Sequence, residues 1–330
     1  MINLPDPTAS LLQVSDLRTV FRRADGVEAA AVDDVSFNVG RGETLGLVGE
    51  SGSGKSVTAL SVVRLVAPPG RIAGGRILLE GTDLMAIDDA GMRQVRGRRI
   101  GFVFQEPMAA LDPVYTVGSQ IQETLKAHGL AAGSAASRRA IELLDAVRVP
   151  DPARRSREFP HQLSGGLRQR AMIALALAAE PSLVIADEPT TALDVTIQAE
   201  ILDLLRDMRR MFNLSVLLIT HDLGIVAEMA DRVAVMYSGR IVETGSVRAV
   251  LDAPSHPYTR ALLASVPSGV PGVRPLSIAG QVPSIFDRPL GCAFAPRCPD
   301  RFARCADRPP LFTVASDRQA ACFLHERTTE

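Results

Sequence analysis

The chain has 330 residues, enough for one large domain or two ordinary ones, and 46% of them are hydrophobic, which is ample for a buried core. Lysine and arginine (36) nearly balance aspartate and glutamate (37), and a solvated surface explains the arginine cluster at residues 93–99, so we expect no nucleic-acid partner. No run approaches the roughly 18 uninterrupted apolar residues of a membrane span, and residues 1–7 lack the pattern of a secretory signal. We therefore expect a cytosolic protein that reaches a membrane only through a partner.

Residues 11–48 predict an antiparallel, hairpin-rich opening, with separate short strands at 12–14 and 17–21 among them. The last strand, 43–48, leads into Gly49-Glu50-Ser51-Gly52-Ser53-Gly54-Lys55-Ser56, which fits the motif G-x-x-x-x-G-K-[ST] and is called the phosphate loop below. Glycines let its N–H groups face phosphate oxygens, the Lys55 ammonium reaches the β- and γ-phosphates, and the Ser56 hydroxyl binds Mg²⁺. A predicted helix at 56–63 would turn its positive N-terminus toward the same anion, so the sequence predicts a nucleoside triphosphate site.

Further strands are expected at 76–79 and 101–104, and a helical insertion at about 108–165 interrupts the α/β pattern. Strands then alternate with helices, with buried strands at 183–188 and 215–220, a helix at about 197–211, and a hairpin over 232–243. This order predicts an α/β domain over residues 1–253, with a mixed, mostly parallel sheet covered on both faces and an antiparallel β subdomain. The composition shifts at Pro254, so we expect a separate C-terminal extension over 254–330.

Two further motifs belong to a site that hydrolyses the triphosphate. Asp187 ends a buried strand, where a second Mg²⁺ ligand is expected, and Glu188 follows as the residue that orients or deprotonates the attacking water. Ser164-Gly165-Gly166, within Leu163–Arg170, begins a helix at about 166–179 and so provides another anion-binding helix N-terminus. One nucleotide rarely needs two such sites from one chain, so we expect the second to serve a nucleotide held by another subunit.

At this point the chain resembles the ATP-binding cassette (ABC) ATPases, which are phosphate-loop NTPases with an LSGG-x-x-QR signature just ahead of the Walker B strand. The resemblance implies that Gln105 is the Q-loop glutamine, which contacts Mg²⁺ and links the site to a transmembrane partner. It implies that His221 is the switch histidine on the γ-phosphate and that Asp194 of the D-loop communicates across a dimer. Phe21 occupies the A-loop position that stacks on adenine, although core packing is the alternative.

The expected catalytic residues are Glu188, His221 and Gln105, and the expected Mg²⁺ ligands are Ser56, Gln105 and Asp187. The residues expected to bind ATP within one subunit are Phe21, Gly49, Ser51, Gly52, Ser53, Gly54, Lys55, Ser56, Val57, Gln105, Asp187 and His221. Those expected to reach the nucleotide of the other subunit are Ser164, Gly165, Gly166 and Asp194.

Residues 104–113, 256–262 and 291–299 are similar to those of the dipeptide/oligopeptide importer group. This resemblance implies a second, related ABC ATPase subunit, two transmembrane permease subunits and an extracytoplasmic solute-binding protein, with this chain peripheral on the cytoplasmic face of the inner (plasma) membrane. Family members import peptides, and some import nickel or another small solute, so these substrates are alternatives. A soluble ABC ATPase of translation or DNA repair is another alternative, but such proteins usually carry two cassettes or a long coiled-coil insertion, which this sequence lacks. A regulatory module without turnover is disfavoured by the intact hydrolytic residues.

All four cysteines, Cys292, Cys298, Cys305 and Cys322, lie in the extension with the spacing C-x5-C-x6-C-x16-C. Two disulfides would need an oxidising compartment, and four unrelated free thiols this close together are unusual, so a Cys₄ metal site is expected. Zinc knuckles with C-x2-4-C spacing are absent. The family resemblance implies a [4Fe–4S] cluster with a structural or regulatory role, while Zn²⁺ and an extension without metal stay as alternatives.

Overall fold

The computed structural model describes residues 10–266 and 276–326. Residues 1–7, where the sequence lacks a signal pattern, lie outside this part of the chain. Within the described residues, none of the helices has both the length and the apolar character needed to cross a membrane. The chain forms two compact units: a first unit of residues Met1–Val39, Thr44–Met85 and Ile219–Glu330, and a second unit of residues Gly40–Glu43 and Ala86–Leu218.

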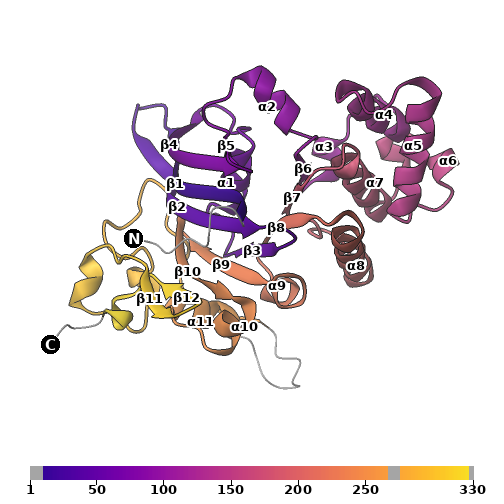
Figure 1. Cartoon of the computed structure of the whole chain (residues 1–330). Coiled ribbons are helices and arrows are strands. Elements are labelled where there is room, and N and C mark those ends of the chain that lie inside the picture. Colours follow the sequence, from indigo (N-terminus) through magenta and orange to yellow (C-terminus); the bar gives the residue numbers. More distant parts are fainter. Residues whose placement is uncertain (1–9, 267–275, 327–330) are drawn as a thin grey trace. The chain divides into compact units, whose positions relative to one another are not determined.

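The first unit contains the predicted antiparallel opening as a four-stranded sheet of order β2-β1-β4-β5 (Figure 1). Its strands are β1 (Ser10–Arg22), β2 (Glu28–Gly40), β4 (Gly70–Leu79) and β5 (Thr82–Asp83). The prediction of two separate strands at 12–14 and 17–21 was wrong, because β1 runs through both. A register shift between Ser15 and Arg18, with Asp16 at φ 50°, absorbs the irregularity as a β-bulge instead of a turn.

A second sheet of the first unit runs in the order β11-β12-β10-β9-β3. Its strands are β3 (Thr44–Val48), β9 (Arg232–Tyr237), β10 (Arg240–Ser246), β11 (Phe312–Ala315) and β12 (Arg318–Ala320). The buried strand β3 pairs parallel with β9, while β9 and β10 form the predicted hairpin. The helices of this unit are α1 (Lys55–Val62), α9 (Leu223–Met229), α10 (Val247–Asp252) and α11 (Pro257–Ala264).

Residues on both sides of the predicted boundary at 253/254 share one hydrophobic core in the first unit. Val48 from β3 and Tyr237 from β9 lie in the same buried cluster as Tyr258 from α11 and Phe294. Strand β12, from the far end of the chain, pairs antiparallel with β10. The predicted boundary therefore lies inside this unit rather than at its edge.

The second unit holds β6 (Ile100–Val103) and β7 (Leu183–Asp187), which pair parallel, and the start of β8 (Ser215–Thr220) beside β7. Its helices are α2 (Asp89–Val95), α3 (Pro107–Ala110), α4 (Val117–Ala127), α5 (Gly133–Ala146), α6 (Pro152–Arg155), α7 (Gly165–Leu177) and α8 (Val195–Phe212). Helices α4, α5 and α6 lie together (Figure 1), within the range predicted for the helical insertion. The mixed α/β fold with an antiparallel β subdomain confirms the predicted fold class.

Candidate nucleotide-binding site

The phosphate loop joins the buried strand β3 to helix α1 in the first unit, as the sequence predicts. A Cβ atom on Gly49 would lie 2.1 Å from the carbonyl oxygen of Met236, so no larger residue fits there. Gly54 stands just before α1 with φ 103°, and a Cβ atom on it would lie 2.6 Å from the carbonyl oxygen of Ala31. The two glycines therefore allow a loop that is packed closely against neighbouring backbone.

The Lys55 side chain is buried inside this loop. Its Nζ donates hydrogen bonds to the carbonyl oxygens of Gly49 at 2.7 Å and of Glu50 at 3.0 Å, and it lies 3.4 Å from Ser53 Oγ. The loop is also held from outside, because the N–H of Gly239 donates to the Ser53 carbonyl at 2.7 Å. The ammonium is thus already placed beside the loop backbone that would surround a phosphate.

Glu50 has two contacts that the sequence motif does not indicate. Its N–H donates to Tyr258 Oη at 2.8 Å, and its carboxylate accepts both terminal nitrogens of Arg297, at 2.8 and 3.0 Å. Tyr258 and Arg297 are separated from Glu50 by 208 and 247 positions in the sequence, so no local pattern could have revealed these pairs.

Two further predicted ATP-site residues belong to the first unit. Phe21 is half-buried near the end of β1 and is paired with Gly70 of β4, where a Cβ atom would lie 2.7 Å from the Phe21 ring. The absence of a side chain at Gly70 therefore makes room for this ring. His221 is exposed and directly follows β8.

The second unit brings together Gln105 and Glu188, two of the predicted catalytic residues. Gln105 Nε2 lies 3.4 Å from Glu188 Oε2, and the Thr191 hydroxyl donates to the same oxygen at 2.8 Å. Asp187 is buried at the end of β7, and the backbone at Glu188 turns sharply, with φ 46°. The strand thus ends at the two carboxylates, as predicted. The sequence does not indicate the Thr191 contact.

The signature residues lie at two helix starts of the second unit. Ser164 caps α7 by accepting the N–H of Leu167 at 3.4 Å, and Asp194 caps α8 by accepting the N–H of Ile197 at 2.9 Å. A Cβ atom on Gly166 would lie 2.9 Å from Ile197 Cγ2, so the two helix starts pack closely at this glycine. Ser164, Gly165 and Asp194 are all exposed.

The predicted site residues are therefore divided between the two units. The first carries Phe21, the phosphate loop with Val57, and His221, while the second carries Gln105, Ser164, Gly165, Gly166, Asp187, Glu188 and Asp194.

The four cysteines are all free thiols and line one small cavity in the first unit, of about 10 Å³, which is room for about one water molecule. Rings of Phe294, Phe302 and Phe323 form much of the wall. Burial raises the pKa of the Cys292 and Cys322 thiols above 9.0 and that of Cys298 to about 11. In the described part of the chain, no three His, Cys, Asp or Glu side chains are arranged so that they could hold a metal ion. The donor set fits a thiolate-bound metal, but the thiols would have to move to bind one.

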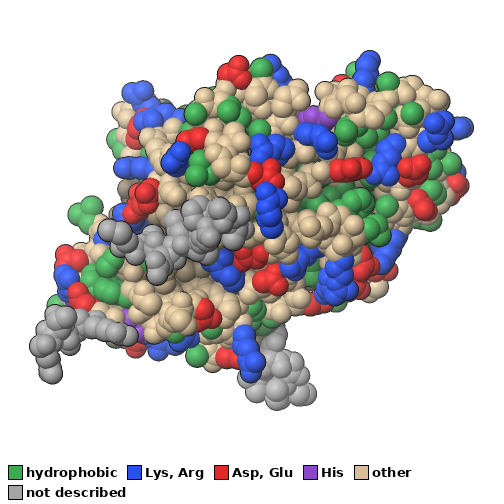
Figure 2. Space-filling model, in the orientation of Figure 1, with side chains coloured by type: hydrophobic (Ala, Val, Ile, Leu, Met, Phe, Trp, Pro, Cys, Tyr) green, Lys and Arg blue, Asp and Glu red, His purple; other side chains and the backbone are tan. Residues whose placement is uncertain are grey.

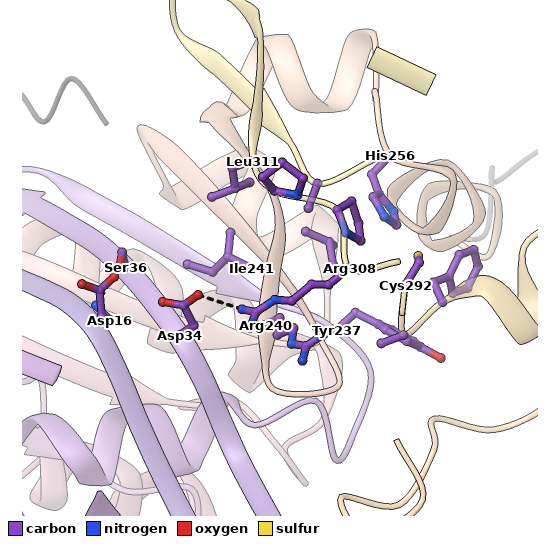
Figure 3. A pocket seen from close by; sticks show the side chains of 16 residues that line it. Asp16, Asp34, Ser36, Tyr237, Arg240, Ile241, His256, Cys292, Arg308 and Leu311 are labelled. Carbon is purple, nitrogen blue, oxygen red and sulfur yellow. Dashed lines mark hydrogen bonds and ion pairs between the residues drawn. The ribbon is translucent and has the colours of Figure 1, made fainter. Parts of the chain in front are cut away.

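A larger cavity of about 480 Å³ adjoins the cysteine cavity in the first unit and shares His256, Cys292 and Phe294 with it (Figure 3). None of the phosphate-loop residues lines it. Two of its charged side chains already pair with each other, because Arg308 Nη2 lies 2.8 Å from Asp34 Oδ2. It is therefore not the nucleotide site, in spite of its size.

Comparison with known proteins gives the same assignment as the motifs. The family model described as ABC transporter matches residues 32–191, and the model described as oligopeptide/dipeptide transporter, C-terminal region, matches residues 242–305. A protein of Brucella abortus (strain 2308), provisionally named a peptide import ATP-binding protein, is 51% identical over 316 residues, covering 96% of this chain and 95% of its own. A second protein of that provisional name, from Brucella melitensis, is 51% identical over 327 residues, covering 95% of this chain and 96% of its own.

Solved structures of cassettes share the fold. A dimeric ATP-binding cassette in a post-hydrolysis state, bound to ADP and phosphate, is 27% identical with a TM-score of 0.65 and covers 72% of this chain and 99% of its own. A component of a Clostridium perfringens ABC transporter complex is 27% identical with a TM-score of 0.62 and covers 74% of this chain and 92% of its own. The chain therefore belongs to the ATP-binding proteins of ABC transporters, in the oligopeptide/dipeptide transporter family.

Proposed function

We propose that this chain hydrolyses ATP to power the import of dipeptides or oligopeptides. The observation that carries the proposal is the match over 96% of the chain, at 51% identity, to a relative provisionally named for peptide import. The matched C-terminal region disfavours the soluble, non-transport ATPase, while nickel or another small solute stays as the alternative cargo. Basic and acidic side chains are intermixed on the visible face (Figure 2), as the net charge of −1 leads one to expect.

In the proposed site, the phosphate loop binds the triphosphate through its backbone N–H groups and Lys55. The Lys55 ammonium now donates to two loop carbonyls, so ATP binding would exchange those partners for phosphate oxygens. Ser56, Gln105 and Asp187 are the proposed Mg²⁺ ligands, and the ion supplies charge neutralisation on the β- and γ-phosphates. Phe21 is proposed to stack on the adenine, and the remaining loop residues with Val57 enclose the phosphates.

Glu188 is the proposed base for the attacking water. Gln105 and Thr191 both lie at its Oε2 atom, so they orient the carboxylate at the end of β7. His221 is proposed to contact the γ-phosphate and to stabilise the charge that develops on it. This arrangement gives the hydrolytic step one base and one γ-phosphate ligand from the same chain.

A second, related ATPase subunit is proposed to complete each site. The exposed residues Ser164, Gly165 and Asp194, with Gly166, would face the nucleotide of that subunit, because a helix N-terminus stabilises an anion. A structural relative is itself a dimer, which supports this arrangement. A single copy should bind ATP but hydrolyse it poorly.

The proposed membrane partners are two permease subunits served by an extracytoplasmic solute-binding protein, with this chain on the cytoplasmic face of the inner membrane. Shortly after Gln105, the large apolar side chains Met108, Val114 and Tyr115 are 41%, 70% and 54% exposed. Tyr115 also lines a groove of about 380 Å³ beside α4. We propose this surface as the permease contact, since exposed apolar side chains mark interaction sites. Val114→Asp should then reduce recovery of the permease subunits in a pull-down, while Val27→Asp at another exposed valine should not.

We also propose that Cys292, Cys298, Cys305 and Cys322 hold a [4Fe–4S] cluster, with Zn²⁺ as the alternative. All four line one cavity, and a bound metal would supply the driving force for deprotonating thiols whose pKa burial has raised. Anaerobic purification with iron and acid-labile sulfide assays should give about four of each per chain. Zinc without iron would favour the Zn²⁺ alternative. A preparation that contains neither iron nor zinc would refute the metal site.

Glu188→Gln tests the hydrolytic assignment. The variant should keep ATP affinity, lose nearly all turnover and accumulate as an ATP-bound dimer, because the amide cannot accept the proton of water. Glu142→Gln is the control, since that exposed glutamate lies on α5 and carries no proposed catalytic role. Wild-type turnover in Glu188→Gln would refute the assignment.

A further inference from the structure

We infer that Arg297 and Tyr258, from the C-terminal part of the chain, are positioning residues of the phosphate loop. Both act on Glu50, the second residue of the loop, from opposite ends of that residue. The inference rests on the proposed nucleotide site. It assigns to the cysteine-bearing segment a part in ATP binding.

Arg297 makes a two-pronged ion pair with Glu50. Its two terminal nitrogens lie 2.8 and 3.0 Å from the two carboxylate oxygens, the fork geometry that makes arginine–carboxylate pairs strong and directional. The Arg297 side chain is 5% exposed and that of Glu50 is 27% exposed, so solvent screens the pair only weakly. Replacing a whole buried pair by apolar side chains often costs no stability, so the directional fork of this pair is the property that bears on the loop.

The rest of the guanidinium is also held. Its Nε donates to the Ala279 carbonyl at 2.8 Å, and its Nη2 lies 3.3 Å from the Ile278 carbonyl. Its Cζ lies 5.8 Å from the Tyr237 ring centroid and 5.9 Å from that of Phe294, which is cation–π distance. The Arg297 head therefore has one defined position, and the Glu50 carboxylate is fixed with it.

Tyr258 holds the backbone of the same residue. The Glu50 N–H donates to Tyr258 Oη at 2.8 Å, and the tyrosine is fully buried. Its own place is set at the start of α11, where His256 Nδ1 accepts the N–H of Tyr258 at 3.0 Å. The buried Glu243 carboxylate in turn accepts the N–H groups of Ser255 at 2.7 Å and His256 at 2.9 Å. A continuous series of hydrogen bonds thus runs from β10 to the phosphate loop.

The consequence reaches Lys55. Glu50 is held at its N–H by Tyr258 and at its carboxylate by Arg297, while its carbonyl oxygen accepts the Lys55 ammonium. Releasing Glu50 would allow the loop to sample conformations that do not bind phosphate, and this lowers apparent affinity. The chemical step should be less affected once ATP is bound, because neither positioning residue is expected to touch the reacting atoms.

Arg297 is also joined to the cysteines by the chain itself. It directly precedes Cys298 and follows Cys292 by five positions. The segment that carries two of the four thiols therefore also carries the guanidinium that holds Glu50. The conformation of that segment and the conformation of the phosphate loop therefore both depend on the Arg297–Glu50 ion pair.

The test uses three small changes: Glu50→Gln, Arg297→Lys and Tyr258→Phe. Binding of a fluorescent ATP analogue to the purified chain and ATPase kinetics of the assembled transporter are measured for each. We expect about tenfold weaker binding and a correspondingly higher KM, with kcat changed less than about twofold. Glu50→Gln leaves the Arg297 guanidinium buried without its carboxylate and should lower the melting temperature, so binding and kinetics are measured below the unfolding transition of each variant. The double variant Glu50→Gln/Arg297→Lys should be scarcely worse than either single variant, since both remove the same pair.

Arg304→Lys is the matched control, because Arg304 forms ion pairs with Glu326 and Asp307 in the same extension and should keep wild-type affinity. Lys55→Ala separates the two proposals. If Lys55→Ala binds the analogue as wild type does, the proposed nucleotide site is wrong. If Lys55→Ala loses binding while the three test variants bind normally, only the positioning role is refuted.

Discussion

Phe294→Ala should destabilise the whole first unit, not merely the C-terminal segment that contains it. Phe294 is 1% exposed and packs among Tyr237, Tyr258 and His256, with ring centroids 5.3, 5.4 and 6.0 Å away. Tyr237 belongs to β9, the strand that pairs with β3 ahead of the phosphate loop. Removing the ring therefore opens a cavity in a core that residues on both sides of position 253 build together.

The magnitude follows from truncating a buried aromatic ring. Phe→Ala in a closed core costs about 3–5 kcal/mol, the upper part of that range applying where neighbours cannot collapse into the space. The edge-to-face contact with Tyr237, at an interplanar angle of 84°, is lost as well. With a urea m-value of about 2 kcal/mol/M, the midpoint of unfolding should fall by about 1.5–2.5 M.

The tyrosines make the assay specific to this unit. The chain has no tryptophan and three tyrosines, and Tyr115, the one in the second unit, is 54% exposed. Near-UV circular dichroism therefore reports mainly on Tyr237 and Tyr258, and a Tyr115→Phe background removes the remaining contribution. Urea titrations are compared for wild type, Phe294→Ala and the control Phe302→Ala, whose ring is 42% exposed and whose loss should cost well under the Phe294 value.

The reasoning is refuted by one pattern. If the tyrosine signal of Phe294→Ala is lost in two steps, with the part from Tyr258 of α11 disappearing at lower urea and the part from Tyr237 of β9 keeping its wild-type midpoint, the extension unfolds alone. Residues 254–330 would then be an independent domain, as their composition suggests.

Two other perturbations test the loop and its support. Gly49→Ala should abolish ATP binding, because the added Cβ atom would lie 2.1 Å from the Met236 carbonyl oxygen. Gly74→Ala is the control and should bind ATP normally, because a Cβ atom there has no neighbour within 4 Å among the described residues, apart from those next to it in the chain. Equal binding by the two variants would contradict the close packing of the loop. His256 should make the protein less stable in mild acid. Burial lowers the pKa of His256 to about 3 from 6.5, so below pH 6.5 the unfolded chain takes up a proton that the folded chain refuses. The free energy of unfolding should fall by about 2 kcal/mol at pH 5, and this loss should vanish above pH 7. In urea titrations, His256→Gln should flatten this dependence of stability on pH. His161→Gln, at an exposed position, is the control and should leave the dependence unchanged. An unchanged slope in His256→Gln would contradict the buried, neutral imidazole.

Much of the fold could be predicted because its signals are local. Glycines at fixed spacing predict the phosphate loop, and an unbroken apolar run predicts the strand that ends at Asp187. The structure contains both elements. The bulge at Asp16 was missed because its polar residue imitates a turn, and only the pairing with β4 shows that the strand continues. The local sequence therefore predicts that a strand is present better than it predicts where that strand ends.

The contacts of Glu50 could not be predicted for a different reason. In the sequence, Glu50 is one of the variable positions of a phosphate-loop motif, and Arg297 is one arginine among many near the cysteines. Neither residue carries a periodicity or a spacing that depends on the other, because the pair depends on the packing of β3, β9 and α11 around Tyr237 and Phe294. The same holds for Thr191 at Glu188, where the turn after β7 brings a hydroxyl back to the carboxylate.

These observations change how the cysteine-bearing segment should be regarded. If the Arg297–Glu50 pair favours the ATP-binding form of the loop, linkage requires that ATP favour the paired form of the segment by the same free energy. Whatever orders the segment, whether a metal on its thiols or a neighbouring subunit, would then strengthen ATP binding without touching the nucleotide. The coupling needs no long pathway, because the guanidinium, the Glu50 carbonyl and the Lys55 ammonium are successive contacts. If the cysteine-bearing segment served stability alone, an apolar side chain of similar volume at position 297 would stabilise the core at least as well as a buried guanidinium paired with Glu50 of the phosphate loop.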